Sequence, residues 1–420
     1  RALGRGARPM QHVAIIGAGV VGLATAAALQ REGHRITLVD PRAPGEYCSY
    51  GNAGCLSRAS CVPLALPGLW KKVPGWLADP RGPLTIRLAH LPSLMPWLWR
   101  FQRAASPTRV EAIADALHAL VDGTIEHWRP LAAWAGVPEL ILQQGYAFAY
   151  GSAREFDADT LGRAIRRRHG VAIDVLEGPA IREFDPVLSP RLSHLVVLPQ
   201  QGHCPNPLRL SQALAERLRV GGASRVQASA RAFEVVAGRV ARVAVDDRML
   251  AVDAVVIAAG VHANALSSQL GSRVPLTSER GYHVMLDAPG AMPRIPVMSG
   301  TGKYFLTPME GGLRVAGAVE FASVDAAPDW RRADVLLSGA RTLVPALTHG
   351  AVGRWMGHRP SLPDSLPVIA RSPRFANAYF AFGHGHVGLT GAAPTATLIA
   401  DLVAGRAPAI DLKPYAIDRF

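Results

Sequence analysis

Lysine is nearly missing from this basic chain. Only four of its 45 basic residues are lysine (Lys71, Lys72, Lys303 and Lys413), and the formal net charge is +13. Such a charge suits a nucleic acid or an anionic membrane as partner. The arginines, however, are scattered through a chain rich in Ala, Gly and Pro, which indicates a compositional bias. We therefore expect no nucleic-acid partner.

Cysteine is also scarce, with four in 420 residues. Three of them lie close together, but the C-x6-C-x5-C spacing of Cys48, Cys55 and Cys61 fits neither a zinc nor an iron–sulfur site. So few cysteines in so long a chain also give no disulfide framework. These absences predict that the protein has no metal site and works in the reducing cytoplasm.

Charged residues are absent from the segment Pro9–Gln30, which follows several arginines and so resembles a secretory signal or a membrane span. The glycine spacing within this segment, described next, argues against both. No second hydrophobic span follows, so we expect a protein that is soluble or attached to a membrane only at its periphery. Residues 1–9 precede Met10 and look like an extension or tag remnant, which we leave out of the fold.

The most informative motif lies near the start of the chain. The apolar run 13–16 predicts a buried strand, and Gly17, Gly19 and Gly22 follow it at G-x-G-x-x-G spacing. These glycines let the backbone turn, approach a pyrophosphate and pack a helix against the strand. A second predicted strand ends at Asp40, 23 residues after Gly17. In dinucleotide-binding folds, an acidic residue about 20 residues after the glycines binds a ribose hydroxyl. The unit predicts a dinucleotide site.

A second glycine-rich turn lies near the end of the chain. Tyr379–Phe382 predicts a strand that ends at Gly383, and Ala392–Val403 predicts a helix. The turn between them, residues 383–390, offers a second cluster of backbone N–H donors for an electron-rich group. One turn for a pyrophosphate and another for a redox ring fits FAD better than a nicotinamide cofactor.

The length of the chain exceeds one compact core, so we expect two domains. Strands alternate with helices at both ends, whereas strand-like stretches dominate the middle. This order predicts an α/β fold in which a discontinuous Rossmann-like FAD-binding domain is interrupted by an antiparallel-sheet substrate domain. The first domain is predicted over 10–80, 196–275 and 352–420, and the second over 81–195 and 276–351.

The segment 62–103 differs from the rest of the chain. It holds four of the eight tryptophans, many prolines and several basic residues. Tryptophan with basic residues suits peripheral contact with a membrane surface. A surface excursion whose aromatic side chains pack on the domain below is the alternative.

Two further stretches make a family resemblance specific: SYGNAG at 49–54 and RPSLPDSLPVI at 359–369. With the two glycine turns, they resemble the D-amino-acid oxidase family of flavoproteins, and more narrowly the bacterial D-amino-acid dehydrogenases. The resemblance runs in order from about Gln11 to Phe420 and implies a two-domain fold of the glutathione-reductase-2 type, with extended FAD whose ring lies at the domain interface. Neither Cys55 nor Cys61 falls in a linkage motif, so we expect non-covalent FAD.

The residues expected to contact FAD come from both glycine turns, the end of the second strand and the two family stretches. They are Gly17, Ala18, Gly19, Val20, Val21, Gly22, Asp40, Pro41, Arg42, Tyr50, Gly51, Asn52, Ala53, Gly260, Gly357, Gly383, His384, Gly385, His386, Val387, Gly388, Leu389 and Thr390.

The resemblance gives Arg359 the role of carboxylate anchor, since a guanidinium pairs with a carboxylate through two parallel hydrogen bonds. An arginine paired within the fold is the alternative. Tyr282 and Tyr304 are expected to add phenolic hydrogen bonds or wall the pocket, although strand tyrosines often only pack. His384 and His386 are candidate bases for the ammonium proton. The resemblance also implies the alternative, direct hydride transfer without a protein base, in which these histidines only face the flavin. Some relatives place a second cation near His386, so substrate size stays open.

The resemblance implies FAD-dependent oxidative deamination of a D-amino acid, with a cyclic imino acid such as D-proline as one candidate. Hydride transfer from Cα to flavin N5 would give an imine and then a 2-oxo acid, with electrons passed to a quinone or another acceptor. The alternative within the enzyme class is an amine oxidase of the glycine or sarcosine oxidase type that uses oxygen. From another class, the alternative is a flavin-binding electron-transfer subunit of a larger complex.

Overall fold

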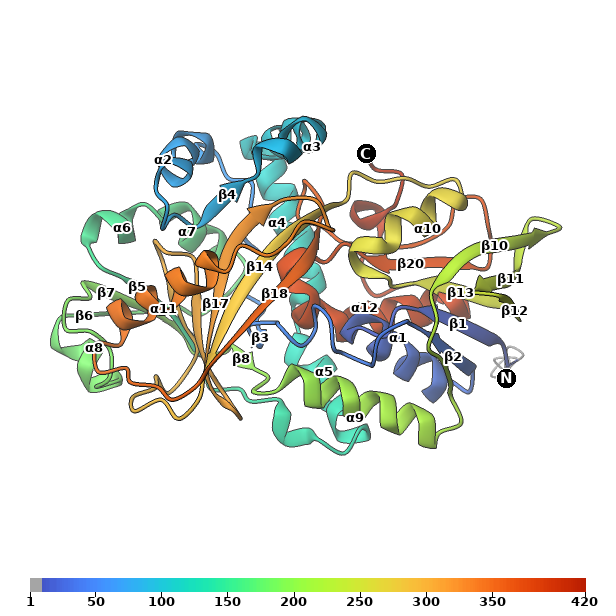
Figure 1. Cartoon of the computed structure of the whole chain (residues 1–420), viewed down its shortest axis with the longest axis horizontal. Helices are drawn as coiled ribbons and strands as arrows, with labels where there is room; N and C mark the ends of the chain where they lie inside the picture. The colour runs from blue at the N-terminus through green and yellow to red at the C-terminus, as the bar shows by residue number, and fades with distance from the viewer. Residues whose placement is uncertain (1–9) are drawn as a thin grey trace, which may run out of the picture.

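Two sheets form the two lobes of the molecule in Figure 1, a computed structural model that describes residues 10–420. The predicted extension 1–9 lies outside the described residues. The smaller of the two sheets follows the order β19-β20-β13-β1-β2-β9, and only β19 is antiparallel to its neighbour. Its strands are β1 (His12–Ile16), β2 (Arg35–Val39), β9 (Ser224–Val226), β13 (Ala254–Ile257), β19 (Val368–Arg371) and β20 (Ala378–Phe382).

Both faces of this sheet are covered, which explains why β1 is apolar and buried at every position. One face packs against helices and the other against a three-stranded sheet and a short helix. The helices are α1 (Val20–Arg31), α9 (Pro207–Val220), α10 (Ala263–Gln269) and α12 (Gly388–Ala404); the small sheet has β10 (Ala230–Val236), β11 (Arg239–Val245) and β12 (Arg248–Ala251). The predicted strand–turn–helix units at both chain ends are confirmed.

The second lobe is a mostly antiparallel sheet of order β18-β14-β17-β16-β15-β5-β7-β6, with β4 paired to β17. Its strands are β4 (Leu84–Ile86), β5 (Tyr146–Tyr150), β6 (Asp174–Glu177), β7 (His194–Leu198), β14 (Thr277–Leu286), β15 (Val297–Ser299), β16 (Phe305–Met309), β17 (Gly312–Phe321) and β18 (Val352–Ser361). One face packs on α8 (Pro179–Phe184) and α11 (Arg331–Leu343). A short ladder pairs β3 (Cys55–Leu56) with β8 (Gly202–His203). The predicted α/β fold class with an antiparallel second sheet is confirmed.

Strand pairing contradicts two of the predicted domain boundaries. The boundary at 352 assigned β18 to the FAD-binding domain, but β18 pairs along its whole length with β14 of the large sheet. The boundary at 196 falls inside β7, which pairs with β5 of the same sheet. Both boundaries are wrong because these pairings join segments that are far apart in sequence, and periodicity alone does not reveal a strand's partner.

Helices also cross the predicted division. The stretch Val110–Ala135 has helical spacing and forms α4 (Pro107–Val121) and α5 (Thr124–Trp134), separated by Gly123 with φ of +70°. Both helices pack on α12 and share the core of the FAD-binding lobe, although we predicted them in the substrate domain. The remaining helices are α2 (Val73–Ala78) and α3 (Leu91–Ala104) at the top of Figure 1, with α6 (Ala153–Asp157) and α7 (Thr160–Arg168) at the outer end of the large sheet.

One described segment, Gly385–Ala404, is long and apolar enough to cross a membrane by length and composition. Most of it is buried against α1, α4 and α5. A core helix packed on all sides has this apolar composition without any membrane.

Candidate active site

A cavity of about 1190 Å³ runs from the glycine turn after β1 to the open face of the large sheet. It is larger than the roughly 300–1,000 Å³ of most small-molecule sites. At one end, Gly17 has φ of +113°, and a Cβ there would lie 2.4 Å from the Ala258 carbonyl oxygen. Only glycine fits this turn, because the backbone conformation and the neighbouring strand both exclude a side chain.

Helix α1 begins at this turn without a side-chain cap and without an acidic residue in its first turn. The positive end of its dipole therefore faces the cavity without an acidic residue of the helix itself beside it. The N–H of Val20 donates to the Ser49 hydroxyl at 2.9 Å. Ser49 thus belongs to the site, and the SYGNAG stretch that we singled out contains it, although we did not predict a role for it.

Asp40 follows β2 and lines the cavity beside this turn. Its Oδ2 accepts a hydrogen bond from the N–H of Ala18 at 2.7 Å, and its Oδ1 accepts one from the N–H of Arg42 at 2.8 Å. The Arg42 guanidinium lies 3.8 Å over the Tyr47 ring, which also stacks with His262. These contacts give the dinucleotide end one fixed carboxylate and a flat aromatic wall.

The second glycine turn lies between β20 and α12 and borders the same cavity. Gly383 and Gly385 have φ of +82° and +52°, and α12, like α1, starts without a side-chain cap or an acidic first turn. Both helices therefore direct uncapped N-termini at one cavity. His384 bonds Thr395 through its Nε2 at 2.9 Å, and burial lowers the pKa of His384 to about 3. A histidine with this pKa is a poor proton acceptor at neutral pH.

Arg359 on β18 lines the cavity between the two turns and the large sheet. Its guanidinium donates to Glu279 Oε1 and to the Ala318 carbonyl, both at 3.1 Å. Glu279 is the direct strand partner of Arg359, and Gly281 leaves the space that the guanidinium fills, since a Cβ there would lie 2.2 Å from Nη2. Arg359 is thus paired within the fold, as one alternative predicts, and also borders the cavity.

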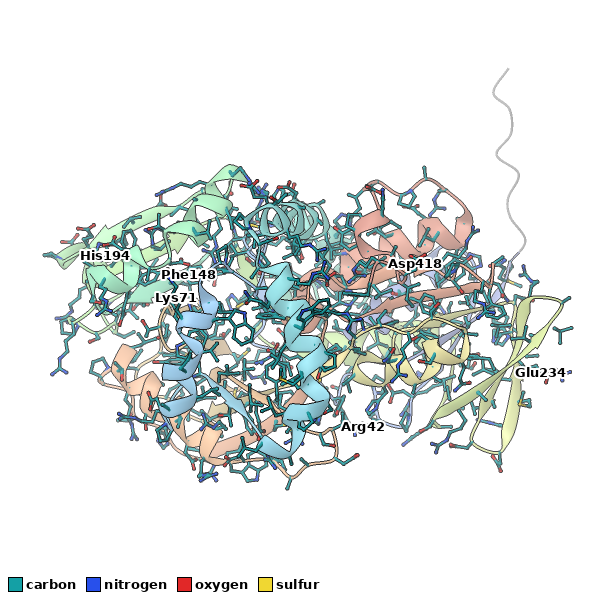
Figure 2. The ribbon with its side chains drawn as sticks, turned by 90° about the horizontal axis from the view of Figure 1, so that it is seen from above. Arg42, Lys71, Phe148, His194, Glu234 and Asp418 are labelled. Atoms are coloured by element: carbon teal, nitrogen blue, oxygen red, sulfur yellow. The ribbon has the colours of Figure 1, made fainter. Side chains whose placement is uncertain are left out.

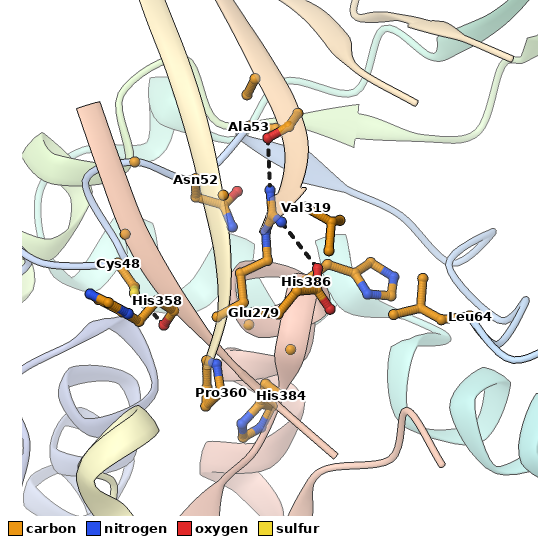
Figure 3. Close-up of a pocket in the computed structure, with 18 of the residues that line it drawn as sticks. Cys48, Asn52, Ala53, Leu64, Glu279, Val319, His358, Pro360, His384 and His386 are labelled. Atoms are coloured by element: carbon orange, nitrogen blue, oxygen red, sulfur yellow. Dashed lines mark hydrogen bonds and ion pairs between the residues drawn. The ribbon is translucent and has the colours of Figure 1, made fainter. Parts of the chain in front are cut away.

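His386 lies near Glu279, as the labels in Figure 3 show. Burial lowers the pKa of His386, Glu279 raises it and Arg359 lowers it further. The second glycine turn therefore lies within electrostatic reach of Arg359.

The family model described as FAD dependent oxidoreductase (DAO) matches residues 12–402. The chain belongs to this FAD-dependent oxidoreductase family. It is 43% identical over 418 residues to a D-amino-acid oxidase of Bradyrhizobium diazoefficiens, covering 98% of this chain and 99% of that protein. It is 31% identical to D-amino acid dehydrogenase 2 of Ralstonia nicotianae, covering 97% and 100%. Glycine oxidase from Geobacillus kaustophilus has the same fold, with a TM-score of 0.75 at 23% identity over 98% of this chain and 100% of that chain.

The residues of this FAD-dependent oxidoreductase fit a long dinucleotide. Two uncapped helix N-termini and the Asp40 carboxylate line one continuous cavity. Predicted contact residues that line it are Gly17, Gly19, Val20, Val21, Asp40, Pro41, Arg42, Gly51, Asn52, Ala53, Gly260, Gly357, Gly383, His384, Gly385, His386, Gly388, Leu389 and Thr390.

Four predicted contact residues do not line the cavity. Ala18 and Val387 are buried at 1% exposure. Gly22 packs α1 on the turn, where a Cβ would lie 1.9 Å from the Gly17 carbonyl oxygen. The ring of Tyr50 meets His283 and Trp355 edge-on. These four residues pack beneath the residues that line the cavity.

The two tyrosines differ. Tyr282 borders the cavity, but its ring packs, like that of Tyr304, in the core cluster of the large sheet. Its hydroxyl donates to Glu320 at 2.5 Å and accepts from the N–H of Asp329. Burial and the hydrogen bond to Glu320 raise the pKa of Tyr282 to about 12. Tyr304 does not line the cavity: its phenol donates to the Gly339 carbonyl of α11 at 2.7 Å. The predicted catalytic role of Tyr304 is therefore wrong, because its side chain packs in the core on the opposite face of the sheet.

Several lining residues were missed by the sequence reasoning. Trp355 fills the space left by Gly51 and Gly357, where a Cβ would lie 2.0 and 2.2 Å from its ring. Glu279 lies beside Arg359 because β14 pairs with β18, and this pairing could not be inferred from local sequence. Cys48 and Cys55 line the cavity, and burial raises the pKa of each thiol to about 12. Within residues 10–420, no group of three His, Cys, Asp or Glu side chains is placed to hold a metal ion.

Proposed function

We propose that this FAD-dependent oxidoreductase oxidises a D-amino acid to an imine, which water hydrolyses to a 2-oxo acid. The observation that carries the proposal is the Arg359 guanidinium, which lines the cavity within electrostatic reach of the second glycine turn. The names of the D-amino-acid oxidase and D-amino acid dehydrogenase relatives support the D configuration.

The side chains of the site bind and orient the substrate. Arg359 binds the carboxylate, and Glu279 holds Arg359 from the neighbouring strand. Arg359 and Glu279 carry opposite charges, so the pair adds no net charge to the pocket. Bound FAD, held by the two glycine turns without a covalent bond, would supply the two-electron acceptor for the Cα–H bond. Burial lowers the pKa of His384 to about 3, so this side chain is a poor base at neutral pH; the amine must arrive neutral or lose its proton to water or to His386.

An anaerobic screen of D- and L-amino acids against purified holoenzyme tests the proposal. We expect D-amino acids to bleach the flavin absorbance and L-amino acids to leave it unchanged. A yellow protein that no amino acid bleaches would favour the electron-transfer subunit instead. Turnover with an artificial dye, compared with peroxide formation in air, then separates a dehydrogenase with a quinone-type acceptor from an oxidase that uses oxygen.

We also propose that the segment 62–103 touches a membrane from the cytoplasmic side, which would bring the site near a membrane quinone. Its outward side chains include Leu77, Leu88, Met95 and Trp99, which are 47%, 83%, 53% and 56% exposed. Trp70 and Trp76 line the cavity instead. Triple replacement of Leu88, Met95 and Trp99 by Ser should therefore reduce co-sedimentation with anionic vesicles. Sedimentation that is absent in the unmodified protein would refute the contact.

A further inference from the structure

The cavity continues well past Arg359, along the open face of the large sheet. Ala316, Phe305, Met298 and Phe148 occupy one register row on β17, β16, β15 and β5, and all four line the cavity. Their side chains make an apolar floor three strand spacings wide, roughly 14 Å at about 4.8 Å a strand. Arg359 lies at one edge, since it donates to the Ala318 carbonyl of β17.

A second guanidinium lies at the other edge of this floor. Arg166 of α7 stands with its Cζ 4.5 Å above the Phe148 ring, and the residue is only 8% exposed. Its Nη1 makes a long interaction of 3.4 Å with Asp159, and its Nε is buried without a hydrogen-bond partner. Buried charges are normally paired and hydrogen-bonded. Arg166 is therefore a buried cation with unused donors on the cavity wall.

Other cations gather around Arg166. Lys303, on the turn between β15 and β16, lines the cavity; burial lowers its pKa, Asp159 raises it, and Lys72 and Arg166 lower it further. Two of the four lysines of the chain thus meet at this end. The Asp159 carboxylate is already shared, because it accepts the Tyr150 hydroxyl at 2.7 Å. Figure 2 shows the molecule from above, with Phe148 and Lys71 labelled at this end.

The excess of positive charge over an apolar floor suits one kind of ligand. A neutral or cationic amino-acid side chain would leave the Arg166 donors unpaired, which costs free energy. A carboxylate at the end of an aliphatic chain would satisfy them while its methylene groups cover Phe305 and Met298. The carboxylate that Arg359 holds and this second anion would then lie at opposite edges of the same floor.

We propose that Arg166 and Lys303 form a specificity site for an anionic side chain, so that the substrates are D-amino acids with a second carboxylate. The inference rests on the proposed function, because it assigns the class of substrate to that same site. The width of the floor favours D-glutamate or D-2-aminoadipate over the shorter D-aspartate.

The test compares matched substrates on the holoenzyme. We expect kcat/KM for D-glutamate to exceed that for its neutral isostere D-glutamine by about 10- to 100-fold, as a charge-assisted pair implies. Arg166→Gln should remove most of this ratio. Lys303→Gln, whose side chain faces the cavity, should lower it by a smaller factor and serves if Arg166→Gln fails to fold.

Two control variants remove the same charge nearby. Arg167, the neighbour of Arg166 on α7, is exposed and does not line the cavity. Lys71, next to Lys72, is also exposed and does not line the cavity. Arg167→Gln and Lys71→Gln should keep the D-glutamate preference of the unmodified protein. A preference for D-glutamine, or a ratio that Arg166→Gln leaves unchanged, overturns the specificity site.

A binding measurement separates failure of this site from failure of the proposed function. Glutarate and its monoamide are unreactive, and their binding can be followed through the flavin spectrum. We expect glutarate to bind more tightly, and Arg166→Gln to abolish the difference. If no D-amino acid is oxidised but this difference is found, the proposed function fails while the anion site stands; equal affinities overturn the anion site even if neutral D-amino acids are oxidised.

Discussion

The two ends of the cavity are built in opposite ways. At the dinucleotide end, backbone atoms and glycines set the shape: a Cβ at Gly17 would meet the Ala258 carbonyl oxygen at 2.4 Å. At the substrate end, charged side chains from distant strands set it, with Arg359 and Glu279 paired at 3.1 Å across β14 and β18. A backbone-built end tolerates almost no substitution, whereas an end built from side chains can change its ligand by single replacements.

The largest effect is expected from Gly17→Ala. The alanine must adopt φ near +113° and also displace the next strand, which together cost about 2–5 kcal/mol of folding free energy. Denaturant unfolding and the FAD-to-protein ratio measure the loss. Gly33→Ala is the matched control, since Gly33 has φ of +90° but open space around its Cβ position. Equal losses in the two variants would show that strain, and not contact with β13, governs this turn.

At the substrate end, Arg359→Ala should weaken amino-acid binding by about 2–4 kcal/mol, because charge-assisted hydrogen bonds are lost and Glu279 is left without its partner. FAD content should stay close to that of the unmodified protein. Arg354→Ala on the same strand removes only an exposed ion pair with Asp334 and should change KM little. An unchanged KM in Arg359→Ala would rule out the anchor.

The sequence predicted the dinucleotide end more completely than the substrate end, because the residues that meet there are close together in the sequence. Strand, glycine turn, helix and Asp40 are consecutive, so spacing alone predicts their arrangement. Glu279 and Arg359 are 80 residues apart, and only the pairing of β14 with β18 brings them together. Tyr304 was misplaced because alternation shows that neighbours face opposite sides, as Tyr304 and Phe305 do, but not which side holds the cavity.

His384 lies on the second glycine turn, and its burial predicts a pH effect on the stability of the protein. The pKa of His384 is about 3 in the folded protein and about 6.5 when unfolded. Between these values the unfolded state binds the extra proton, so stability falls as the pH drops below about 6.5. From about pH 7 to about pH 5, His384 should account for a loss of about 2 kcal/mol.

Denaturant unfolding at fixed FAD concentration measures this loss, and His384→Gln should reduce it, because glutamine does not titrate and can still bond Thr395. Above about pH 7.5 the two proteins should show the same pH dependence, since the imidazole is neutral in both states. An identical acid-side decline in both proteins would mean that other buried groups, such as His283 with its pKa lowered to about 3, dominate.

The smallest effect is expected from Asp40→Asn, which changes the carboxylate of the dinucleotide end. The amide keeps an oxygen that can accept from Ala18 or Arg42 but loses the charge that strengthens a bond to a ribose hydroxyl. FAD affinity should fall by about 1–2 kcal/mol, or about 5- to 30-fold in Kd. Glu46→Gln, an exposed acid outside the cavity lining, should leave Kd unchanged. If Asp40→Asn also leaves Kd unchanged, Asp40 only fixes the turn, and the dinucleotide end is held by backbone alone.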